Sequence, residues 1–384
     1  MGSGTCSTPG CEDGREGVWG RSHARERRQE TVTARPRARE TGLVIGTLPC
    51  GPHNAITDVG EVRVGHVSLV AGEGPLVPGK GPVRTGVTAI LPHPGNIYRE
   101  RVTAAVHIFN GFAKATGLIQ VEELGELETP ILITGTLNVP RVADGVISWM
   151  VRENPGIGIT GPTVNPVVAE CHDGYLNDAQ GRHVREEHVF AALDGAKGGP
   201  VEEGAVGAGV GTACYGFKGG VGTSSRILPD AAGGFRVGVL VVTNMGRRED
   251  LLVAGVPVGQ LLPRADPHIV QGGSVVVILA TDAPLDPVSL RRVARRCPIG
   301  LARTGWTGGY RSGDLVIAFT TGRTMEEVDP ETLNLCFRAA AEATEEAVLN
   351  SLFRATTLAG RDGHVLEALP LEETLTLLRR AGRI

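Results

Sequence analysis

Two long apolar runs in the C-terminal half are the strongest pattern along the chain. Residues 237–246 and 274–285 consist mainly of Val, Ile and Leu, and each run is long enough for a strand that is buried on both faces. Shorter apolar stretches predict further strands at 81–93, 129–137 and 314–322, and a hairpin at 55–70.

Helical spacing of apolar residues predicts helices over 142–151, 287–297 and 330–355. Strands outnumber helices, which favours stacked sheets flanked by helices in one layered α/β or α+β domain. No apolar run reaches the roughly 18–20 residues of a membrane-spanning helix, so we expect a soluble protein without a membrane partner.

The first 40 residues differ from the rest of the chain. Seven arginines lie between Arg21 and Arg39, among polar residues with no apolar period, and no apolar core of a secretory signal is present. We therefore predict a disordered N-terminal extension over 1–40, followed by a single domain over 41–384.

Composition narrows the class of protein further. A net charge of −4 offers no general attraction to nucleic acid. The seven cysteines are widely spaced, without a CxxC pair or a zinc-type cluster, which indicates a reduced, cytoplasmic protein with no metal site. The 55 glycines are about twice the average usage and indicate many tight turns and close backbone contacts.

Several familiar catalytic motifs are absent from the sequence. It contains neither HExxH nor GxSxG, and the segment GGVGTSSR (219–226) lacks the lysine of a phosphate-binding loop. The segment GAGVGT (207–212) resembles a dinucleotide loop only loosely.

The segment QGGS (271–274) directly precedes a strongly apolar strand. It has two interpretations, a simple turn or a self-cleaving junction. In the second, the Ser274 hydroxyl attacks the carbonyl of Gly273, and hydrolysis leaves Ser274 as a new N-terminus. Its α-amine, with a reference pKa of about 7.7–8.0, could then act as the local base.

Other polar residues lie at predicted strand ends. Ser312 and Asp314 flank a glycine before the strand at 314–322, and Asn244 lies near the end of the strand at 237–246. Glu170 and Asp173 follow an apolar stretch. Each position could be an ordinary turn or capping residue. Together they could orient a nucleophile's proton, donate to an oxyanion and hold an ammonium group.

Nine segments in collinear order resemble the L-aminopeptidase/D-esterase family, or β-aminopeptidases, which are self-processing hydrolases with an N-terminal nucleophile. The matching segments are ITDVGEVRVGHVSL, GVTAILPH, ELETPILITGT, ECHDGYLND, GFKGGVGTSSR, NMGRREDLLVAGVPVG, GGSVVVILATDAPL, GLARTGWTGGYRSGDLVIAFTT and EATEEAVLNSL. They span roughly residues 50–355. Any one of them is weak, whereas nine in order are highly specific.

The resemblance implies an α+β fold, a four-layer αββα sandwich with the new N-terminus between the sheets. It implies a single cut between Gly273 and Ser274, which gives a large chain, 1–273, and a small chain, 274–384. Relatives assemble as oligomers, so we expect a homo-oligomer of processed chains. No metal or organic cofactor is implied.

The resemblance also implies roles for individual residues. Ser274 is the nucleophile, Ser312 and Asp314 complete its hydrogen-bond set, and Asn244 binds the oxyanion. Glu170 is expected to hold the free amine of a small peptide, or of an amino-acid amide or ester. The expected reaction cleaves the bond after the N-terminal residue through an acyl-enzyme on Ser274.

The amine side of the site departs from the family pattern. His172 stands where close relatives tend to have an aromatic residue, so it joins Glu170 as a candidate substrate-binding residue, and Cys171 precedes it. Two alternatives stay open. One is a related amidohydrolase or acyltransferase of the same fold, acting on pantetheine-type or oligoamide substrates. The other is an uncleaved, inactive scaffold.

Overall fold

The structure is a computed structural model that describes residues 1–2, 35–263, 273–323 and 328–384. The chain divides into two units, Met1–Ala34 and Arg35–Ile384, and the second contains all of the elements described below. The predicted disorder of the extension concerns mostly residues 3–34, which lie outside the described residues.

A six-stranded sheet forms the centre of the second unit. Its strand order is β4 (Glu126–Leu127), β3 (Val102–Gly111), β12 (Ser312–Thr320), β11 (Gly273–Thr281), β10 (Arg236–Asn244) and β9 (Val221–Ile227). Only β11 and β12 pair in parallel. A parallel pair needs a crossover connection, and α5 (Pro287–Ala294) and α6 (Cys297–Arg303) provide it.

A four-stranded sheet stacks on the first one. Its strand order is β1 (Arg63–Ala71), β2 (Val83–Leu91), β5 (Ile131–Gly135) and β6 (Val167–Cys171). Here β5 and β6 are the parallel pair, and α2 (Val139–Glu153) connects them. The remaining elements are shorter or peripheral: α1 (Leu118–Leu124), α3 (Glu186–Asp194), α4 (Val258–Leu261), α8 (Leu371–Arg380), β7 (Ala213–Cys214), β8 (Phe217–Lys218), β13 (Leu358–Ala359) and β14 (Val365–Leu366).

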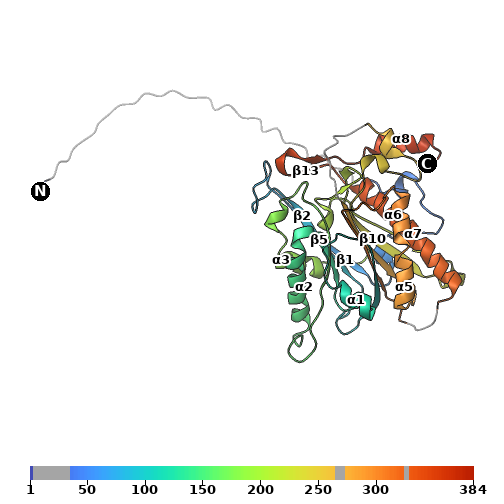
Figure 1. The fold of residues 1–384 in the computed structure, drawn as a ribbon, viewed down its shortest axis with the longest axis horizontal. Helices are drawn as coiled ribbons and strands as arrows, with labels where there is room; N and C mark the ends of the chain where they lie inside the picture. The colour runs from blue at the N-terminus through green and yellow to red at the C-terminus, as the bar shows by residue number, and fades with distance from the viewer. Residues whose placement is uncertain (3–34, 264–272, 324–327) are drawn as a thin grey trace, which may run out of the picture. The chain divides into compact units, whose positions relative to one another are not determined.

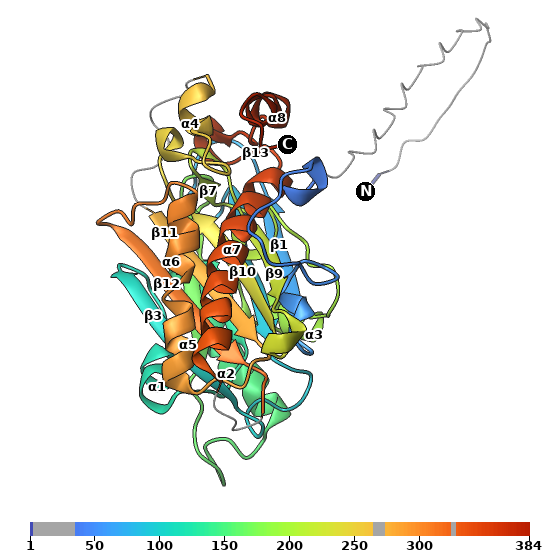
Figure 2. The ribbon, with the colours of Figure 1, turned by 90° about the vertical axis from the view of Figure 1, so that its right-hand side faces the viewer.

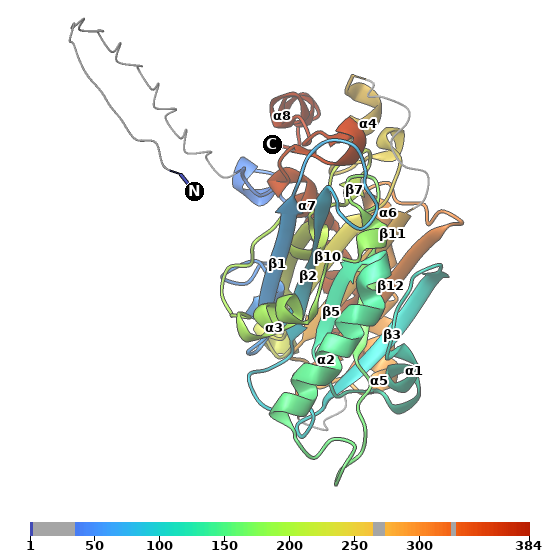
Figure 3. The ribbon, with the colours of Figure 1, turned by 90° about the vertical axis from the view of Figure 1, so that its left-hand side faces the viewer.

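Helices cover the outer face of each sheet (Figure 1). The pair α2 and α3 lies on the four-stranded sheet (Figure 3), whereas α5, α6 and the long α7 (Pro330–Arg354) lie on the six-stranded sheet (Figure 2). The alternation along β11 separates two cores: Val276 and Ile278 pack between the sheets, and Val275 and Val277 pack toward the helices. The predicted four-layer αββα sandwich is therefore confirmed.

The predicted hairpin at 55–70 is wrong. Residues Ile56–Asp58 form a short 3-10 helix, because the Asp58 carboxylate accepts the backbone N–H groups of His53 and Ala55 and the hydroxyl of Ser225. The strand β1 begins only at Arg63 and pairs with β2, so the hairpin that forms is β1–β2.

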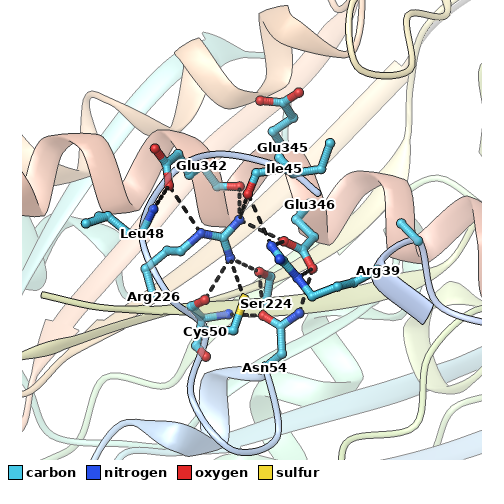
Figure 4. A network of polar contacts seen from close by, with 12 residues as sticks. Arg39, Ile45, Leu48, Cys50, Asn54, Ser224, Arg226, Glu342, Glu345 and Glu346 are labelled. Atoms are coloured by element: carbon cyan, nitrogen blue, oxygen red, sulfur yellow. Dashed lines mark hydrogen bonds and ion pairs between the residues drawn. The ribbon is translucent and has the colours of Figure 1, made fainter. Parts of the chain in front are cut away.

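A buried ionic network fastens the start of the second unit to α7 and β9 (Figure 4). The fully buried Arg226 guanidinium contacts Glu346 at 2.7 Å and Glu342 at 3.3 Å. Arg39 reaches the same Glu346 carboxylate at 2.7 Å. Although burial opposes ionisation, the hydrogen bond from Arg39 and the charges of Arg226 and Arg39 hold the pKa of Glu346 below its usual value. Packing therefore begins at Arg35, before the predicted boundary at residue 40.

We expect Arg226→Met to lower the free energy of unfolding by about 3–5 kcal/mol, because it leaves two buried carboxylates short of a cation. Urea unfolding of both proteins measures the change. Arg152→Met is the matched control, since Arg152 forms its ion pair with Asp194 at the surface and should matter by about 1 kcal/mol or less. Equal losses in the two variants would contradict a stabilising role for the network.

Candidate active site

Ser274 lies at the start of β11, between the two sheets. Its side chain shares a strand face with Val276 and Ile278, which pack in the inter-sheet core, and it is buried. The backbone N–H of His172, just past the end of β6, donates a hydrogen bond to Ser274 Oγ at 3.1 Å. The hydroxyl is therefore held by the opposite sheet.

Asn244 ends β10 directly across from Ser274 in the antiparallel ladder. The backbone N–H of Ala213 donates to its Oδ1 at 3.1 Å. This contact turns the amide nitrogen Nδ2 away, and Nδ2 is buried without a hydrogen-bond partner among the described residues. A buried donor without an acceptor is costly unless a ligand or an intermediate supplies one.

Ser312 and Asp314 lie at the start of β12 and contact each other, with Ser312 Oγ donating to Asp314 Oδ1 at 2.6 Å. Residue Gly273 pairs with Ser312 in the parallel ladder, and a side chain on Gly273 would come within 3.3 Å of Ser312 Oγ. Paired residues share a face, so Ser312 and Asp314 flank the Gly273–Ser274 bond from the face opposite to the Ser274 hydroxyl.

Asn110 is a member of this cluster that the sequence analysis missed. Its Nδ2 donates to Asp314 Oδ2 at 2.7 Å. Burial raises the pKa of Asp314, and the donors Ser312, Asn110 and the backbone N–H of Val275 oppose that rise. The ladder between β3 and β12 is irregular at Asp314, so that Phe109 forms a bulge next to Asn110.

Glu170 lies near the end of β6 and is buried. The Thr136 hydroxyl donates to Glu170 Oε2 at 2.6 Å, and the backbone N–H of Lys114 donates to Oε1 at 3.3 Å. Burial raises the pKa of Glu170, and these donors partly offset the rise. The exposed His172 side chain approaches the same threonine, with Nδ1 at 3.4 Å from the Thr136 hydroxyl.

Cys171 lies between Glu170 and His172 in the sequence, and its side chain packs in the inter-sheet core. Its thiol donates to the Val242 carbonyl at 3.2 Å and lies 3.8 Å from the Ser274 carbonyl oxygen. Complete burial raises the pKa of the Cys171 thiol well above its ordinary value, so the thiol stays protonated and is a packing group. Asp173 does not join the cluster, since its carboxylate accepts the buried Thr85 hydroxyl at 2.5 Å.

The arrangement brings the predicted residues to one end of the sandwich. A serine hydroxyl, an unpartnered amide donor, a hydrogen-bonded carboxylate and a second carboxylate all lie at the ends of neighbouring strands. A cavity of about 1500 Å³ opens at the opposite end of the six-stranded sheet, with Thr103, Thr320 and Leu333 in its lining, and it holds none of these residues. The site has the groups of a serine hydrolase whose nucleophile begins a central strand.

Within the described ranges, no group of three or more His, Cys, Asp or Glu side chains is placed to hold a metal ion. Among the helices of the same ranges, none is both long enough and apolar enough to cross a membrane.

Comparisons with known proteins agree with this class. Residues 54–366 match peptidase family S58. The chain is 42% identical over 376 residues to the β-peptidyl aminopeptidase BapA of Sphingosinicella microcystinivorans, which covers 91% of this chain and 93% of that protein. The chain therefore belongs to peptidase family S58 and is a serine aminopeptidase.

Two solved structures have the same fold. A protein from Pyrococcus horikoshii OT3 has a TM-score of 0.84 at 49% identity, covering 91% of this chain and all of that one. The L-aminopeptidase D-Ala-esterase/amidase of Ochrobactrum anthropi has a TM-score of 0.82 at 40% identity, covering 91% of this chain and 99% of that one. The latter is described as a variant of the Ntn hydrolase fold, which confirms the fold expected from the sequence.

Proposed function

We propose that the chain cleaves itself between Gly273 and Ser274, and that the product hydrolyses peptides and amides after their N-terminal residue through an acyl-enzyme on Ser274. The observation that carries this proposal is the pairing of Ser274 with Asn244. A hydroxyl held by the His172 N–H lies across the ladder from a buried amide donor that has no partner among the described residues. A tetrahedral oxyanion would supply the missing acceptor.

Self-cleavage would begin with the Ser274 hydroxyl attacking the Gly273 carbonyl carbon. The C–N bond then breaks, the proton passes to the leaving nitrogen, and an ester links Gly273 to Ser274 Oγ. Water hydrolyses this ester and leaves a free carboxylate on Gly273 and a free α-amine on Ser274. Ser312, Asp314 and Asn110 border this bond and are suited to holding the new ammonium group.

Turnover would repeat the same chemistry on a substrate. The hydroxyl attacks the carbonyl of the N-terminal residue, the α-amine of Ser274, which borders Ser312, takes the proton, and the Asn244 amide donates to the oxyanion. The amine leaves with a proton, and water releases the acyl group. Binding of the substrate's ammonium falls to Glu170, which is buried and hydrogen-bonded on both carboxylate oxygens.

The name of the Sphingosinicella relative supports β-amino-acid substrates, and the name of the Ochrobactrum enzyme supports α-amino-acid amides and esters. We propose that both classes of N-terminal residue enter this site, with His172 beside the ammonium pocket. The two classes differ by one methylene between ammonium and carbonyl, so the separation of Glu170 from Ser274 decides the preference.

We also propose that the enzyme works in the cytoplasm as a homo-oligomer of processed chains. All five cysteines in the described ranges are free, which favours a reducing compartment. The apolar side chains of Ile108 on β3, Phe112 just after β3 and Ile119 on α1 are exposed, which favours a contact with a second copy.

We expect the purified protein to consist of two chains, 1–273 and 274–384, and Ser274→Ala to remain one full-length, inactive chain. Intact mass spectrometry under denaturing conditions measures both. Ser68→Ala is the control, since this serine on β1 accepts the Gly207 N–H away from the site, and its loss should leave cleavage unchanged. Cleavage of Ser274→Ala at the same bond would overturn the assigned nucleophile, and an uncut native protein would overturn self-processing.

We expect Thr136→Val to move the acid limb of kcat/KM to higher pH by about one unit. The Thr136 hydroxyl stabilises the ionised form of Glu170 by a hydrogen bond, and the valine variant lacks this bond. The sign follows from the carboxylate: its pKa, already raised by burial, rises further, so a higher pH is needed to ionise it and bind the substrate's ammonium. A pH–rate profile measures the shift.

Thr116→Val is the matched control for this experiment, because the Thr116 hydroxyl donates to the Pro166 carbonyl and not to Glu170. The acid limb of kcat/KM should stay in place in this variant. An unmoved limb in Thr136→Val would mean that Glu170 does not govern substrate binding.

A further inference from the structure

Lys218 is a buried cation close to the site that the proposed reaction does not use. It lies on the short strand β8, and its side chain is completely buried. Its ammonium donates three hydrogen bonds to backbone carbonyls, those of Gly209 at 2.8 Å, Thr212 at 2.9 Å and Gly219 at 2.8 Å. All three N–H groups of a protonated lysine are therefore used.

Burying an ammonium group is costly, and here it contacts neutral carbonyls in place of a carboxylate. Desolvation lowers the pKa of Lys218 to about 7, whereas the three carbonyl acceptors around Nζ favour the charged form. Because burying this ammonium group is destabilising, we expect it to have a role that a neutral side chain could not have.

One of the three carbonyls leads directly to the site. The Thr212 carbonyl and the Ala213 N–H belong to the same peptide group. Lys218 donates to that carbonyl, and that N–H donates to Asn244 Oδ1 at 3.1 Å. Hydrogen bonds in such a chain polarise one another, so a cation at one end makes the peptide N–H a stronger donor. A stronger contact at Oδ1 fixes the Asn244 amide with Nδ2 turned away and makes Nδ2 a better donor.

We infer that Lys218 is a positioning residue for the reaction: its ammonium orients and polarises the Thr212–Ala213 peptide, which in turn sets the Asn244 amide toward the oxyanion. This inference rests on the proposed role of Asn244. Lys218 itself contacts neither substrate nor the reacting atoms.

The hairpin turn formed by β7 and β8 is also held by contacts that do not involve the Lys218 ammonium group. The Met245 N–H donates to the Ala213 carbonyl at 3.1 Å, the Lys218 N–H donates to Glu367 O at 2.7 Å, and β7 pairs with β8. Removing the charge should therefore leave the turn in place and affect the Thr212–Ala213 peptide together with the carbonyls of Gly209 and Gly219.

The test is a double-mutant cycle with Lys218→Met and Asn244→Ala, using alanine and β-alanine p-nitroanilides as substrates. Intact mass spectrometry gives the processed fraction, to which the rates are normalised. We expect Asn244→Ala to lower kcat about 10²–10³-fold. We expect Lys218→Met to lower kcat about tenfold with KM nearly unchanged, and to have little further effect when Asn244 is already alanine.

Tyr215→Phe is the matched control. It removes a buried hydrogen bond, to the Thr304 hydroxyl at 2.8 Å, from the same turn without touching the Thr212–Ala213 peptide. It should leave kcat within about twofold of the native value. An equal loss of kcat in Tyr215→Phe and Lys218→Met would show that any damage to the turn has this effect, and would overturn the inference.

A second measurement does not depend on activity or self-cleavage. In uncut Ser274→Ala protein carrying 15N-labelled asparagine, the Asn244 side-chain amide signal is identified by its loss in Asn244→Ala. It should shift on Lys218→Met, or on Lys218→Gln if the methionine variant does not fold, and stay unchanged on Tyr215→Phe.

The outcomes separate the inference from the proposed function. An unmoved Asn244 signal, or an equal Lys218→Met penalty with and without Asn244, overturns the role of Lys218 and leaves the hydrolase mechanism intact. An unchanged kcat in Asn244→Ala would instead remove Asn244 from the mechanism, and the role of Lys218 with it.

Discussion

The contact between the end of β6 and the start of β11 is the constraint on which the rest of the site depends. It is where the two sheets meet through polar atoms, with the His172 N–H on Ser274 Oγ and the Cys171 thiol near the Ser274 carbonyl oxygen. Below it, the sheets are held apart by an apolar layer that includes Val168 and Val276. The packing of this layer fixes Ser274, on one sheet, relative to Glu170, on the other.

The alternation of side chains along the strands places the site residues on two faces of the six-stranded sheet. Ser274 and Asn244 face the four-stranded sheet, which carries Glu170, whereas Ser312 and Asp314 lie beside the same bond on the other face. A slip of one residue in β11 would exchange the two faces and turn the hydroxyl toward the helices. The pairing of β11 with β10 on one side and with β12 on the other, along nearly its whole length, opposes such a slip. The strand pairing that builds the sheet therefore also orients Ser274, the proposed nucleophile.

The sequence predicted the parts of the structure that depend on local pattern. The strands β10, β11 and β12 and the helices α2, α5 and α7 lie where apolar runs and helical spacing placed them. The prediction of a hairpin at 55–70 was wrong because the Asp58 carboxylate accepts hydrogen bonds from nearby backbone N–H groups. A pattern of apolar residues does not reveal such contacts. The identity of the candidate site came from the order of nine motifs, since each polar residue alone fits an ordinary turn.

Asn110 and Lys218 could not be assigned in that way, because their contacts depend on long-range geometry. Asn110 reaches Asp314 only because β3 pairs with β12 and bulges at Phe109. Lys218 acts on backbone carbonyls, and these carry no signature in a sequence. The sequence does carry a weak signal for each residue. Asn110 precedes the glycine that ends β3, and Lys218 is one of only four lysines in the chain and has glycines close to it on both sides.

Gly273 shows how the site and the strand constrain each other. A side chain there would come within 3.1 Å of the Asn244 carbonyl oxygen and 3.3 Å of Ser312 Oγ, so the close approach of β10 and β12 at this point leaves little room for one. That approach is what brings Ser312 and Asp314 to the bond and Asn244 opposite Ser274. The glycine before Ser274 therefore follows from the strand spacing that assembles the site, as well as from the bend that the proposed attack on the Gly273 carbonyl needs. One steric condition thus serves both the proposed self-cleavage and the turnover that would follow it.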